Sequence, residues 1–473
     1  MEKIMPKKLG VFHIVGIGGI GMSAIAKIML NMGYNVQGSN LDANFNTKSL
    51  QKLGINVFIG HSENNVQNIN CLIISSIILS DNVEVRYAKK NQIPVLKKGD
   101  ILSHLTKGKD VISISGSHGK TTTSALLTYI LKQADLSHIS LVGGIMNGEQ
   151  TNVNMLGQGK HFILESDESD GTFNMVRNHS VVVTNIDREH LEYFHSYQDL
   201  LNGFKKFIAQ KDSKGFALVC IDSPGVIQIL QELSCEKIKK YNIISYGITN
   251  LEADIVAYNI RYFDYYSIFD IKSNSDILPI NVRDIKIPLP GAHNVLNGLA
   301  AIISALKMDI TINSLILENF KGVKRRFNKI LEYKESIIID DYAHHPTEVK
   351  AILKTARNIS DKNSGRVILF FQPHKISRVK ELFQEFVESL SKADIVFITE
   401  IFDVGESLLS SKSSRDLVKY IKKINSNCFF LEDMQQIPDF IKSYYQKHDI
   451  FIIMGAGDIS CMRDMIEHKL YQY

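Results

Sequence analysis

One short loop constrains the fold of this chain more than any other feature. The residues Gly116-Ser117-His118-Gly119-Lys120-Thr121-Thr122 follow an apolar, β-branched run and precede a run of helix-forming residues that begins at Ser124. A strand, a glycine turn and a helix in this order form phosphate-binding loops, because glycines let backbone N–H groups close around an anion and the helix N-terminus adds positive charge. In such a loop Lys120 reaches the outer phosphates and the Thr121 hydroxyl ligates Mg²⁺. We therefore predict a nucleotide site in an α/β domain, in a shortened loop because Ile114 replaces the usual first glycine.

The length and composition are those of a multidomain globular protein. The 473 residues suggest about three domains at roughly 150 residues each. Hydrophobic residues make up 44% of the chain, which is enough for several cores. Basic and acidic residues are nearly balanced, 54 against 50, and no basic cluster is interleaved with aromatic residues, so a nucleic acid partner is not expected.

The cysteines and the apolar runs indicate where the protein works. The five cysteines are scattered and form no Cys-X-X-Cys pair, which argues against a zinc site or a disulfide framework and favours a reducing compartment. Glycines interrupt the first apolar run too early for a signal peptide, and no run of about 18 apolar residues occurs. We therefore expect a cytoplasmic protein without a membrane partner.

The chain opens with a second glycine loop. The expected strand Val11–Val15 is followed by Gly16-Ile17-Gly18-Gly19-Ile20-Gly21 and a helix over Met22–Asn31. This spacing is also that of NAD and flavin sites. The next strand, Tyr34–Gln37, however, ends in Gly38-Ser39-Asn40 and lacks the acid that would bind an adenosine ribose. A nucleotide diphosphate other than NAD is therefore the better interpretation.

Two changes in pattern divide the chain. Strand and helix alternate to about residue 107, and a fresh strand follows Lys107-Gly108. An irregular, β-rich stretch at about 240–288 leads to a second change near Lys321–Phe327, after which clean alternation returns. We expect α/β domains over residues 1–107, 108–322 and 323–473.

The middle region carries the candidates for a metal site. One expected strand ends at Glu165, and another, Val181–Thr184, leads to Asp187 and His190. Because ligand-binding groups gather outside the carboxyl ends of strands in open α/β sheets, these side chains are expected near Thr121. A hard cation that bridges phosphates needs oxygen ligands and tolerates one imidazole.

An acidic loop, Ser166–Asp170, follows Glu165. Charged residues in such a run usually lie in solvent. For Asp167, Glu168 and Asp170 we therefore favour a solvated loop over a functional role.

A later turn enters an alanine-rich helix whose first turn displays His293, Asn294 and Asn297. The two asparagines are three residues apart and share a face of the helix. Their amides could read a purine edge or cap the helix, and this segment alone favours capping.

The last region places polar groups after four expected strands that we take to be consecutive. Because the strands deliver these groups to one edge of a sheet, a functional site is favoured over a purely structural domain. Asp340-Asp341-Tyr342 with His344-His345 follow the first strand, Gln372 to Arg378 follow Val367–Phe371, Glu400 follows Asp394–Thr399, and Gly455 to Asp458 follow Ile450–Met454.

Taken together, the motifs resemble those of the Mur ligases. They are GIGGIGMSAIA (16–26), ISGSHGKTTT (114–123), ESDESDGTF (165–173), TNID..H (184–190), PGAHNVLN (290–297), GVKRRF (322–327), DDYAHHPTEV (340–349), QPHKISR (372–378) and GAGDI (455–459), in this order. The resemblance covers about residues 11 to 460 and is most marked for the alanine-adding branch of the family.

This resemblance implies a three-domain α/β enzyme. A Rossmann-like N-terminal domain would hold a UDP-sugar, a central P-loop ATPase-type domain would hold ATP with Mg²⁺, and a Rossmann-like C-terminal domain would hold an amino acid. The implied reaction transfers the γ-phosphoryl of ATP to the carboxylate of UDP-N-acetylmuramate, and the amine of L-alanine then attacks the acyl phosphate.

The resemblance also implies four sets of site residues. The ATP set is Gly116, Ser117, His118, Gly119, Lys120, Thr121, Thr122, His293, Asn294, Asn297, Arg325 and Arg326, and the metal set is Thr121, Glu165 and His190. The UDP-sugar set is Gly16, Gly18, Gly19, Gly21, Met22, Ser23, Ser39 and Ser75. The amino-acid set is Tyr342, His344, His374 and Arg378, with Arg378 as partner of the carboxylate; the catalytic residues among all these are Lys120, His190, His344 and Arg378.

Two positions depart from the family pattern or leave it open. Asn40 stands where an Asp is usual after Gly-Ser, which puts the uridine contact there in doubt. The wider family often bridges its metals with a carbamylated lysine. Lys205 and Lys206 lie in that neighbourhood. The alanine-adding branch does not depend on such a lysine, and we assign none.

Three other interpretations compete with this one. A sister ligase would join UDP-N-acetylmuramate to a preassembled murein peptide, although its first glycine loop usually differs from GIGGIGMS. An NAD-linked oxidoreductase would depend on residues 16–21, against which the second phosphate loop and the missing acid argue. A nucleotide-switched binding protein would use one bound nucleotide and no ligase chemistry.

Overall fold

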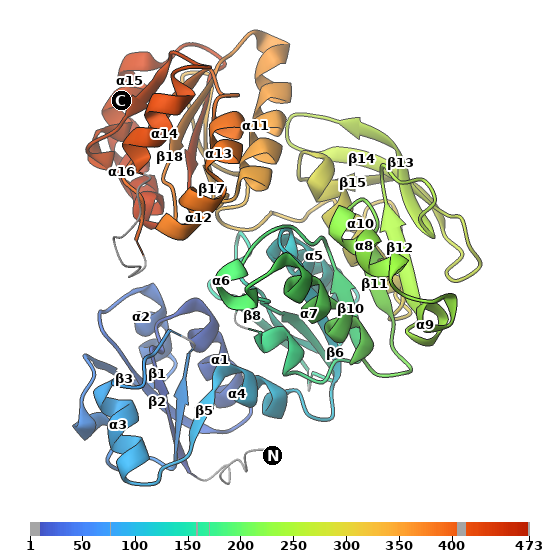
Figure 1. Ribbon diagram of the computed structural model, residues 1–473, viewed down its shortest axis with the longest axis vertical. Helices are drawn as coiled ribbons and strands as arrows, with labels where there is room; N and C mark the ends of the chain where they lie inside the picture. The colour runs from blue at the N-terminus through green and yellow to red at the C-terminus, as the bar shows by residue number, and fades with distance from the viewer. Residues whose placement is uncertain (1–9, 76, 158, 170, 404–412, 472–473) are drawn as a thin grey trace. The chain divides into compact units, whose positions relative to one another are not determined.

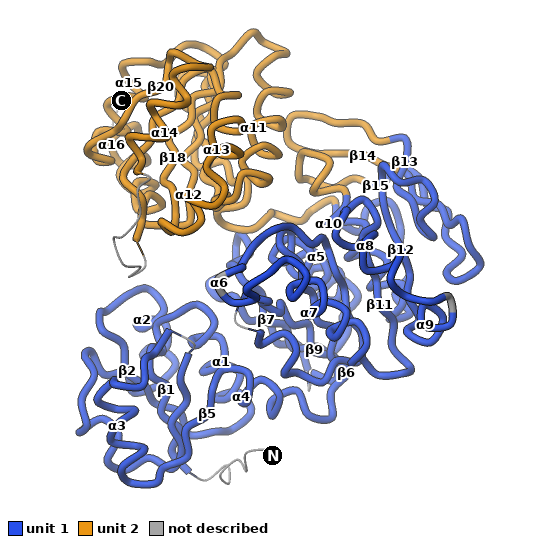
Figure 2. Tube along the Cα trace, in the orientation of Figure 1, with its two compact units in different colours: residues 1–259, 270–285, 296–317 blue, residues 260–269, 286–295, 318–473 orange. Residues whose placement is uncertain are grey.

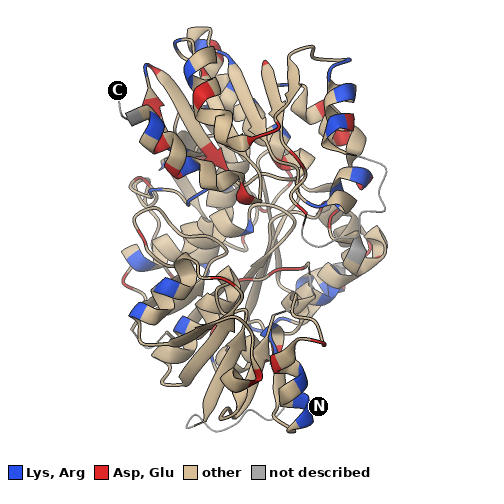
Figure 3. Cartoon of the chain, turned by 90° about the vertical axis from the view of Figure 1, so that its left-hand side faces the viewer, with Lys and Arg blue, Asp and Glu red and all other residues tan. Residues whose placement is uncertain are grey.

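The computed structural model describes residues 10–471 except 76, 158, 170 and 404–412. Asp170 of the acidic loop therefore lies outside the described residues. The chain divides into two compact units, 1–259 with 270–285 and 296–317, and 260–269 with 286–295 and 318–473 (Figure 2). Both basic and acidic residues are spread along many helices and loops rather than gathered in separate regions (Figure 3).

The N-terminal sheet is parallel, with strand order β3-β2-β1-β4-β5 (Figure 1). Its carboxyl edge carries the first glycine loop, since Val15 of β1 pairs with Ser39 of β2 and Ile74 of β4. Phe12 and Ile14 on β1 are buried, as are Ile25 and Ile28 on the helix that follows, and they form the core of this domain. The elements are β1 (Val11–Val15), α1 (Ile20–Asn31), β2 (Asn35–Asn40), α2 (Phe45–Lys52), β3 (Asn56–Ile59), η1 (Glu63–Val66), β4 (Cys71–Ile74), α3 (Val83–Lys90), β5 (Val95–Lys97) and α4 (Lys98–Leu105).

The central sheet has ten strands in the order β15-β14-β13-β12-β11-β10-β6-β9-β7-β8. Strand β6 lies between β10 and β9 and is parallel to both, so the residues after these three strands share one edge. The strands are β6 (Asp110–Ser115), β7 (His138–Leu141), β8 (Val153–Leu156), β9 (His161–Glu165), β10 (Ser180–Val183), β11 (Ala217–Cys220), β12 (Ile243–Gly247), β13 (Ile255–Tyr262), β14 (Ser267–Ser273) and β15 (Asn281–Ile287). The helices are α5 (Lys120–Gln133), η2 (Thr172–Asn174), α6 (Leu191–Phe194), α7 (Tyr197–Ala209), α8 (Pro224–Gln231), α9 (Cys235–Lys240) and α10 (Ala292–Leu306).

The C-terminal sheet has the order β16-β17-β21-β18-β19-β20, with β16 antiparallel to β17. Strands β17, β21 and β18 are parallel neighbours, and their buried residues form two cores, one on each face. The strands are β16 (Asn328–Tyr333), β17 (Ser336–Asp341), β18 (Val367–Phe371), β19 (Ile395–Ile398), β20 (Cys428–Phe430) and β21 (Ile450–Met454). The helices are α11 (Pro346–Ser360), η3 (Asp361–Asn363), α12 (Ile376–Glu381), α13 (Phe383–Leu390), α14 (Ser414–Ile421), η4 (Met434–Gln436), α15 (Ile437–Tyr444), η5 (Asp458–Cys461) and α16 (Met462–Tyr471).

The three sheets with their helices confirm the expected α/β fold class. The domain boundaries stay predictions. Some element bounds differ from the expectation; β2, for example, extends to Asn40 and so includes Gly38-Ser39-Asn40. The helix of the phosphate loop begins at Lys120, directly after Gly119, rather than at Ser124. The four C-terminal strands with polar ends are not consecutive, because β20 lies between β19 and β21 in the chain.

We found no helix of membrane-spanning length and hydropathy in the part of the chain that the structure describes.

Candidate functional site

The phosphate loop has the backbone that its two glycines predict. Gly116 has φ +135° and Gly119 has φ +82°, both in the region that disfavours side chains. A Cβ atom at Gly116 would lie 2.2 Å from Thr184 Oγ1, and one at Gly119 would lie 2.4 Å from Asn297 Oδ1. Gly119 is also the N-cap of α5. Both positions thus require glycine for space as well as for conformation.

Residues after β10 hold the loop in shape. Asn185 accepts hydrogen bonds from the backbone N–H groups of His118 (2.8 Å, through Oδ1) and Ser117 (3.1 Å, through its carbonyl). Its Nδ2 and the Thr184 hydroxyl both donate to the His118 carbonyl, at 2.9 and 2.6 Å. The loop is therefore preorganised by neighbouring side chains, which lowers the cost of ordering it around an anion.

Lys120 lies inside the loop and forms a buried ion pair. Its Nζ donates to Glu168 Oε1 and Oε2 at 2.9 and 3.0 Å, and to the carbonyls of Gly116 and Ser117 at 2.5 and 3.2 Å. Burial alone would lower the pKa of Lys120, but the carboxylates of Glu168, Asp167 and Glu189 raise it above its usual value. The ammonium is therefore charged at the place where a phosphate loop needs a cation.

The acidic loop is not solvated, contrary to the expectation for Glu168. Glu168 is fully buried. Burial raises its pKa, while the Lys120 and His190 charges act in the opposite direction. Asp167 is held ionised: burial would raise its pKa, but the Lys120 and Lys98 charges and other contacts bring it to about 2. Glu168 is paired with the Lys120 cation, as a buried charge must be, and the nearby charges of Lys120 and Lys98 favour the ionised form of Asp167.

Two members of the predicted metal set touch each other. The Thr121 hydroxyl donates to Glu165 Oε1 at 2.8 Å. Glu165 Oε2 accepts from the Ser124 hydroxyl at 3.2 Å and from the backbone N–H of Gly143. A hydroxyl and a carboxylate aimed at one another at the mouth of the loop are the oxygen donors that Mg²⁺ prefers, so the residues fit this ion.

His190 lies beside Glu168. Its Nε2 is 3.6 Å from Glu168 Oε1, and one ligand atom from each of Asp167, Glu168 and His190 falls within 4.8 Å of the others. His190 has φ +59°, so a strained backbone aims this imidazole. The structure thus brings His190 to the Lys120–Glu168 pair. Its place in a metal site with Thr121 and Glu165 stays a prediction.

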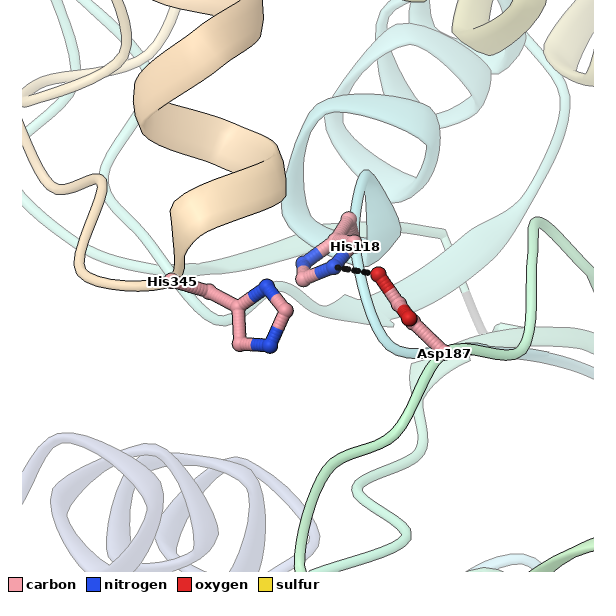
Figure 4. Close-up of side chains that lie close together, drawn as sticks. All are labelled: His118, Asp187 and His345. Atoms are coloured by element: carbon pink, nitrogen blue, oxygen red, sulfur yellow. Dashed lines mark hydrogen bonds and ion pairs between the residues drawn. The ribbon is translucent and has the colours of Figure 1, made fainter. Parts of the chain in front are cut away.

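Asp187 meets the phosphate loop from the other side. Its carboxylate lies 3.4 Å from His118 Nε2, as Figure 4 shows, and its backbone N–H donates to the Ser117 hydroxyl at 2.8 Å. This contact places Asp187 at the loop, as expected, in a supporting position.

The predicted adenine-reading residues separate into two roles. Asn297 accepts from the Thr123 hydroxyl at 3.3 Å and lies against Gly119, so it belongs to the loop. Asn294 donates to the carbonyl of Pro290 at 2.8 Å. It therefore has the capping role that the segment alone favoured. Burial lowers the pKa of His293 to about 4, so this imidazole is neutral.

The N-terminal glycine loop is closed by three asparagines. The Gly18 N–H donates to Asn40 Oδ1 at 3.1 Å, and the Gly18 carbonyl accepts from Asn44 and Asn46 at 3.3 and 2.9 Å. A Cβ atom at Gly18 would lie 2.7 Å from Asn44 Nδ2. Asn40, where an acid is usual, therefore supports the loop.

The remaining UDP-sugar candidates lie at this loop or beneath it. Gly16 has φ +74°, and an ideal Cβ there would be 4.0 Å from Ser75 Oγ, which is buried without a hydrogen-bond partner among the described residues. Gly19 is the N-cap of α1. Met22 and Ser23 are buried in the first turns of α1. Among these candidates Ser75 is therefore the one whose hydroxyl still has its hydrogen-bonding capacity available for a ligand.

Ser39 is fully buried, so its side chain does not face a ligand. Its hydroxyl donates to Glu84 Oε2 at 2.5 Å. Its backbone carbonyl accepts from Gly16 and Ile17 at 2.8 and 3.0 Å. The structure thus places Ser39 under the glycine loop as an anchor.

In the second unit, two arginines lie over one phenol. The guanidinium carbons of Arg325 and Arg326 are 4.7 and 5.1 Å from the centre of the Tyr342 ring. Asp341 accepts from the backbone N–H groups of Phe327 and Ala343 at 2.6 and 2.7 Å, which ties the arginine segment to β17. Burial raises the pKa of Asp341 to about 7, against the Arg326 charge.

The four predicted amino-acid-binding residues form a continuous chain of contacts. The rings of Tyr342 and His344 are 5.3 Å apart, and those of His344 and His374 are 5.8 Å apart. Arg378 Nη1 lies 3.5 Å from His374 Nδ1. The side chain of His374 also stacks on Phe402 at 5.7 Å. These residues, which follow β17 and β18 or lie on α12, thus gather at one edge of the C-terminal sheet.

Several supporting residues were not singled out in the sequence. Asn185 and Ser124 contact the phosphate loop and Glu165 directly. Lys98, the first residue of α4, places Nζ 3.9 Å from the position a Cβ would take at Gly21. Helical spacing could have identified Ser124, because it lies three residues after Thr121 on the same face of the helix. No local signal marks Lys98.

Comparisons with known proteins agree with this geometry. Three family models match in chain order: "Mur ligase family, catalytic domain" at residues 11–110, "Mur ligase middle domain" at 114–305 and "Mur ligase, glutamate ligase domain" at 325–457.

Individual relatives match over nearly the whole chain. A UDP-N-acetylmuramate–L-alanine ligase of Rickettsia felis is 41% identical over 468 residues, which is 98% of this chain and 97% of the relative. One from Rickettsia typhi is 40% identical and covers 98% of this chain and 93% of the relative.

Solved structures share the fold. The UDP-N-acetylmuramate–alanine ligase of Thermotoga maritima matches with a TM-score of 0.81 and 26% identity, over 98% of this chain and 99% of that chain. A murein peptide ligase of Psychrobacter arcticus matches with a TM-score of 0.71 and 19% identity, again over 98% and 99%. The resemblance found in the sequence is thus confirmed, and the chain belongs to the Mur ligase family.

Proposed function

We propose that this protein is an ATP-dependent ligase that joins L-alanine to UDP-N-acetylmuramate through an acyl phosphate in peptidoglycan precursor synthesis. The observation that carries the proposal is the phosphate loop in which Lys120 is charged and Thr121 meets Glu165 at 2.8 Å. Curated relatives about 41% identical over 98% of the chain have this activity in their names, which supports the same substrates here.

The first step brings two anions together. The muramic carboxylate attacks the γ-phosphoryl of ATP, an acyl phosphate forms and ADP leaves. Lys120, at the N-terminus of α5, would stabilise the charge that spreads over the phosphoryl oxygens. The buried, preformed loop means that little reorganisation is needed when this charge develops.

Mg²⁺ fits the site through the Thr121 hydroxyl and the Glu165 carboxylate, with His190 as a further candidate. The ion would supply positive charge to the phosphate oxygens. Ser124 and the Gly143 N–H hold Glu165 in the orientation in which its oxygen meets Thr121. These outer contacts would keep the carboxylate in place during binding.

In the second step the amine of L-alanine attacks the acyl carbon, and phosphate leaves. We propose that Arg378 binds the alanine carboxylate and that Tyr342, His344 and His374 line the same place. Arg378 is buried, and a guanidinium can bind a carboxylate with two parallel hydrogen bonds. His344 is the candidate closest to the amine chemistry.

The sister ligase that takes a preassembled peptide is the remaining rival. Its solved relative shares the fold at 19% identity, while the alanine ligases are about 41% identical. An oxidoreductase or a nucleotide-switched binding protein does not agree with membership of the Mur ligase family.

Phosphate release from ATP tests the proposal. We expect release only when UDP-N-acetylmuramate and L-alanine are both present. Release that requires a tripeptide in place of L-alanine would favour the sister ligase. Release with ATP alone would contradict the proposed reaction.

A further inference from the structure

A buried carboxylate organises the part of the N-terminal domain next to the glycine loop. Glu84, in the first turn of α3, is fully buried, and its pKa is held at about 2 against burial by hydrogen bonds from His13, Ser39 and Asn65. Asn65 Nδ2 and the Ser62 N–H donate to Oε1 at 2.7 and 3.2 Å. Glu84 is therefore a fixed acceptor.

The hydrogen bonds around Glu84 determine which ring nitrogen of His61 carries a proton. The single hydroxyl hydrogen of Ser39 is donated to Glu84 Oε2 at 2.5 Å. His61 Nδ1 lies 3.0 Å from Ser39 Oγ and 3.3 Å from Glu84 Oε2. Both of these oxygens can only accept, so Nδ1 carries a proton, and in the neutral imidazole Nε2 is then the atom with the lone pair.

The Nε2 atom of His61 is the ring nitrogen available to a ligand. Across the described part of the chain, the hydrogen bonds and ion pairs of His61 are made through Nδ1. The side chain keeps 11% of its surface exposed, in contrast to Glu84, which is at 0%. The ring therefore presents an acceptor atom on a rigid support, oriented from behind by a carboxylate.

The position of His61 in the sheet is that of a nucleoside site. The glycine loop follows β1, Ser39-Asn40 end β2, and His61 follows β3, in a sheet ordered β3-β2-β1-β4-β5. In such sheets the diphosphate lies at the N-terminus of the first helix and the nucleoside lies toward the end of the second strand and beyond. Asn40 Oδ1 already accepts a hydrogen bond from the Gly18 N–H. A residue after the next strand, β3, is therefore the better candidate for contact with the base.

We propose that His61 Nε2 accepts a hydrogen bond from N3–H of the uracil ring of the UDP-sugar, and that Glu84 is the positioning residue for this contact. Uracil carries a donor at N3, whereas cytosine carries an acceptor there. A site built around an acceptor therefore favours the uridine nucleotide, because cytosine would leave two lone pairs facing each other. This inference rests on the proposed function, and deepens it by assigning the base-reading residue.

The test compares UDP with CDP, two ligands that differ only in the base. Calorimetry measures the Kd of each for the wild type, His61→Ala, Glu84→Gln and the control His448→Ala, whose histidine pairs with Glu335 in the second unit. We expect the wild type and the control to prefer UDP by about tenfold or more. His61→Ala should bind CDP as the wild type does and lose most of the UDP preference.

Glu84→Gln removes the negative charge and replaces one of the two acceptor oxygens by an NH₂ donor, but keeps the size of the side chain. The UDP preference should fall in this variant too, with binding of CDP as the check that the domain is folded. A wild-type preference retained in Glu84→Gln would overturn the positioning role of Glu84.

The inference and the proposed function fail in different ways. A wild type that releases phosphate with UDP-N-acetylmuramate and L-alanine, while His61→Ala keeps the full UDP preference, overturns only the assignment of His61. A wild type that binds UDP and CDP equally does the same. Absence of that ligase reaction in the wild type would overturn the proposed function.

Discussion

Lys120 Nζ donates to both carboxylate oxygens of Glu168, at 2.9 and 3.0 Å, so the lysine of the phosphate loop and an acid of the next loop hold each other. Both side chains are nearly inaccessible to water, with 14% and 1% of their surfaces exposed. This pair joins the stability of the central domain to the proposed chemistry.

Replacing Lys120 by Ala should affect both properties. Loss of one preorganised positive group should lower the rate of acyl phosphate formation by about 10²–10³-fold, measured in a single turnover. The uncompensated Glu168 should also lower the free energy of unfolding by about 3–5 kcal/mol, measured with urea.

Lys132→Ala is the matched control for this variant. Lys132 lies on the same helix, but its ion pair with Glu149 at 2.7 Å is exposed. Exposed pairs contribute about 0–1 kcal/mol, so this variant should resemble the wild type. Single-turnover rates of the two variants within threefold of each other, a rough margin for such assays, would contradict the role of Lys120.

Thr121→Val should raise the Mg²⁺ concentration needed for half-maximal activity by about tenfold, because it removes a ligand hydroxyl with little change in shape. A magnesium titration of phosphate release measures this. The control is Thr128→Val on the same helix, where the buried hydroxyl donates to the Ser124 carbonyl at 2.7 Å. Equal magnesium curves for the two variants would remove Thr121 from the metal site.

Arg378→Met should raise the KM for L-alanine by about 10–100-fold, because a charged hydrogen bond contributes about 1.5–3 kcal/mol. The KM for ATP should stay near its wild-type value. Arg415→Met, which breaks an exposed pair with Glu432, is the control. Steady-state kinetics with varied alanine measures the effect. A rise in the KM for ATP alone would assign Arg378 to another ligand.

Asp341 should make the stability of the C-terminal domain depend on pH. Its pKa is raised by burial to about 7, above the ordinary value of 3.8, so the folded state binds a proton that the unfolded state has lost. Its contribution is therefore fully present below about pH 4 and is lost as pH rises through 7.

Asp341→Asn, which cannot ionise, isolates this contribution. The wild type's free energy of unfolding, measured relative to the variant, should decrease between pH 4 and pH 7, by up to about 1.4 kcal/mol per pH unit. Urea titrations at several pH values measure the difference. A constant difference would show that Asp341 ionises normally in the folded chain.

Local sequence predicts the strands and loops that depend on neighbouring residues. Val11–Val15, Val367–Phe371 and Ile450–Met454 are strands with the predicted bounds, since short apolar runs between polar ends have few alternatives. Pro346 begins α11, as its fixed φ predicts. The glycine loops followed from spacing, because their backbone conformation is set within a few residues.

Contacts across the sequence escape this kind of reasoning. Glu168 reads as one more acid in a polar loop, and only the fold brings it under Lys120, 48 residues away. Ser39 follows a strand like a ligand-binding residue, yet Glu84 and His61 surround its hydroxyl from other elements. Burial of a polar side chain depends on which distant partner satisfies it, and spacing does not supply that partner.

Calorimetry with a non-hydrolysable ATP analogue and Mg²⁺ tests the central claim most directly. We predict that the wild type binds the analogue in the presence of UDP-N-acetylmuramate and that Gly119→Ala does not. The alanine Cβ would collide with Asn297, and the φ of +82° at this position disfavours any side chain. Folded wild-type protein that takes up no nucleotide, with or without the UDP-sugar, would contradict the account.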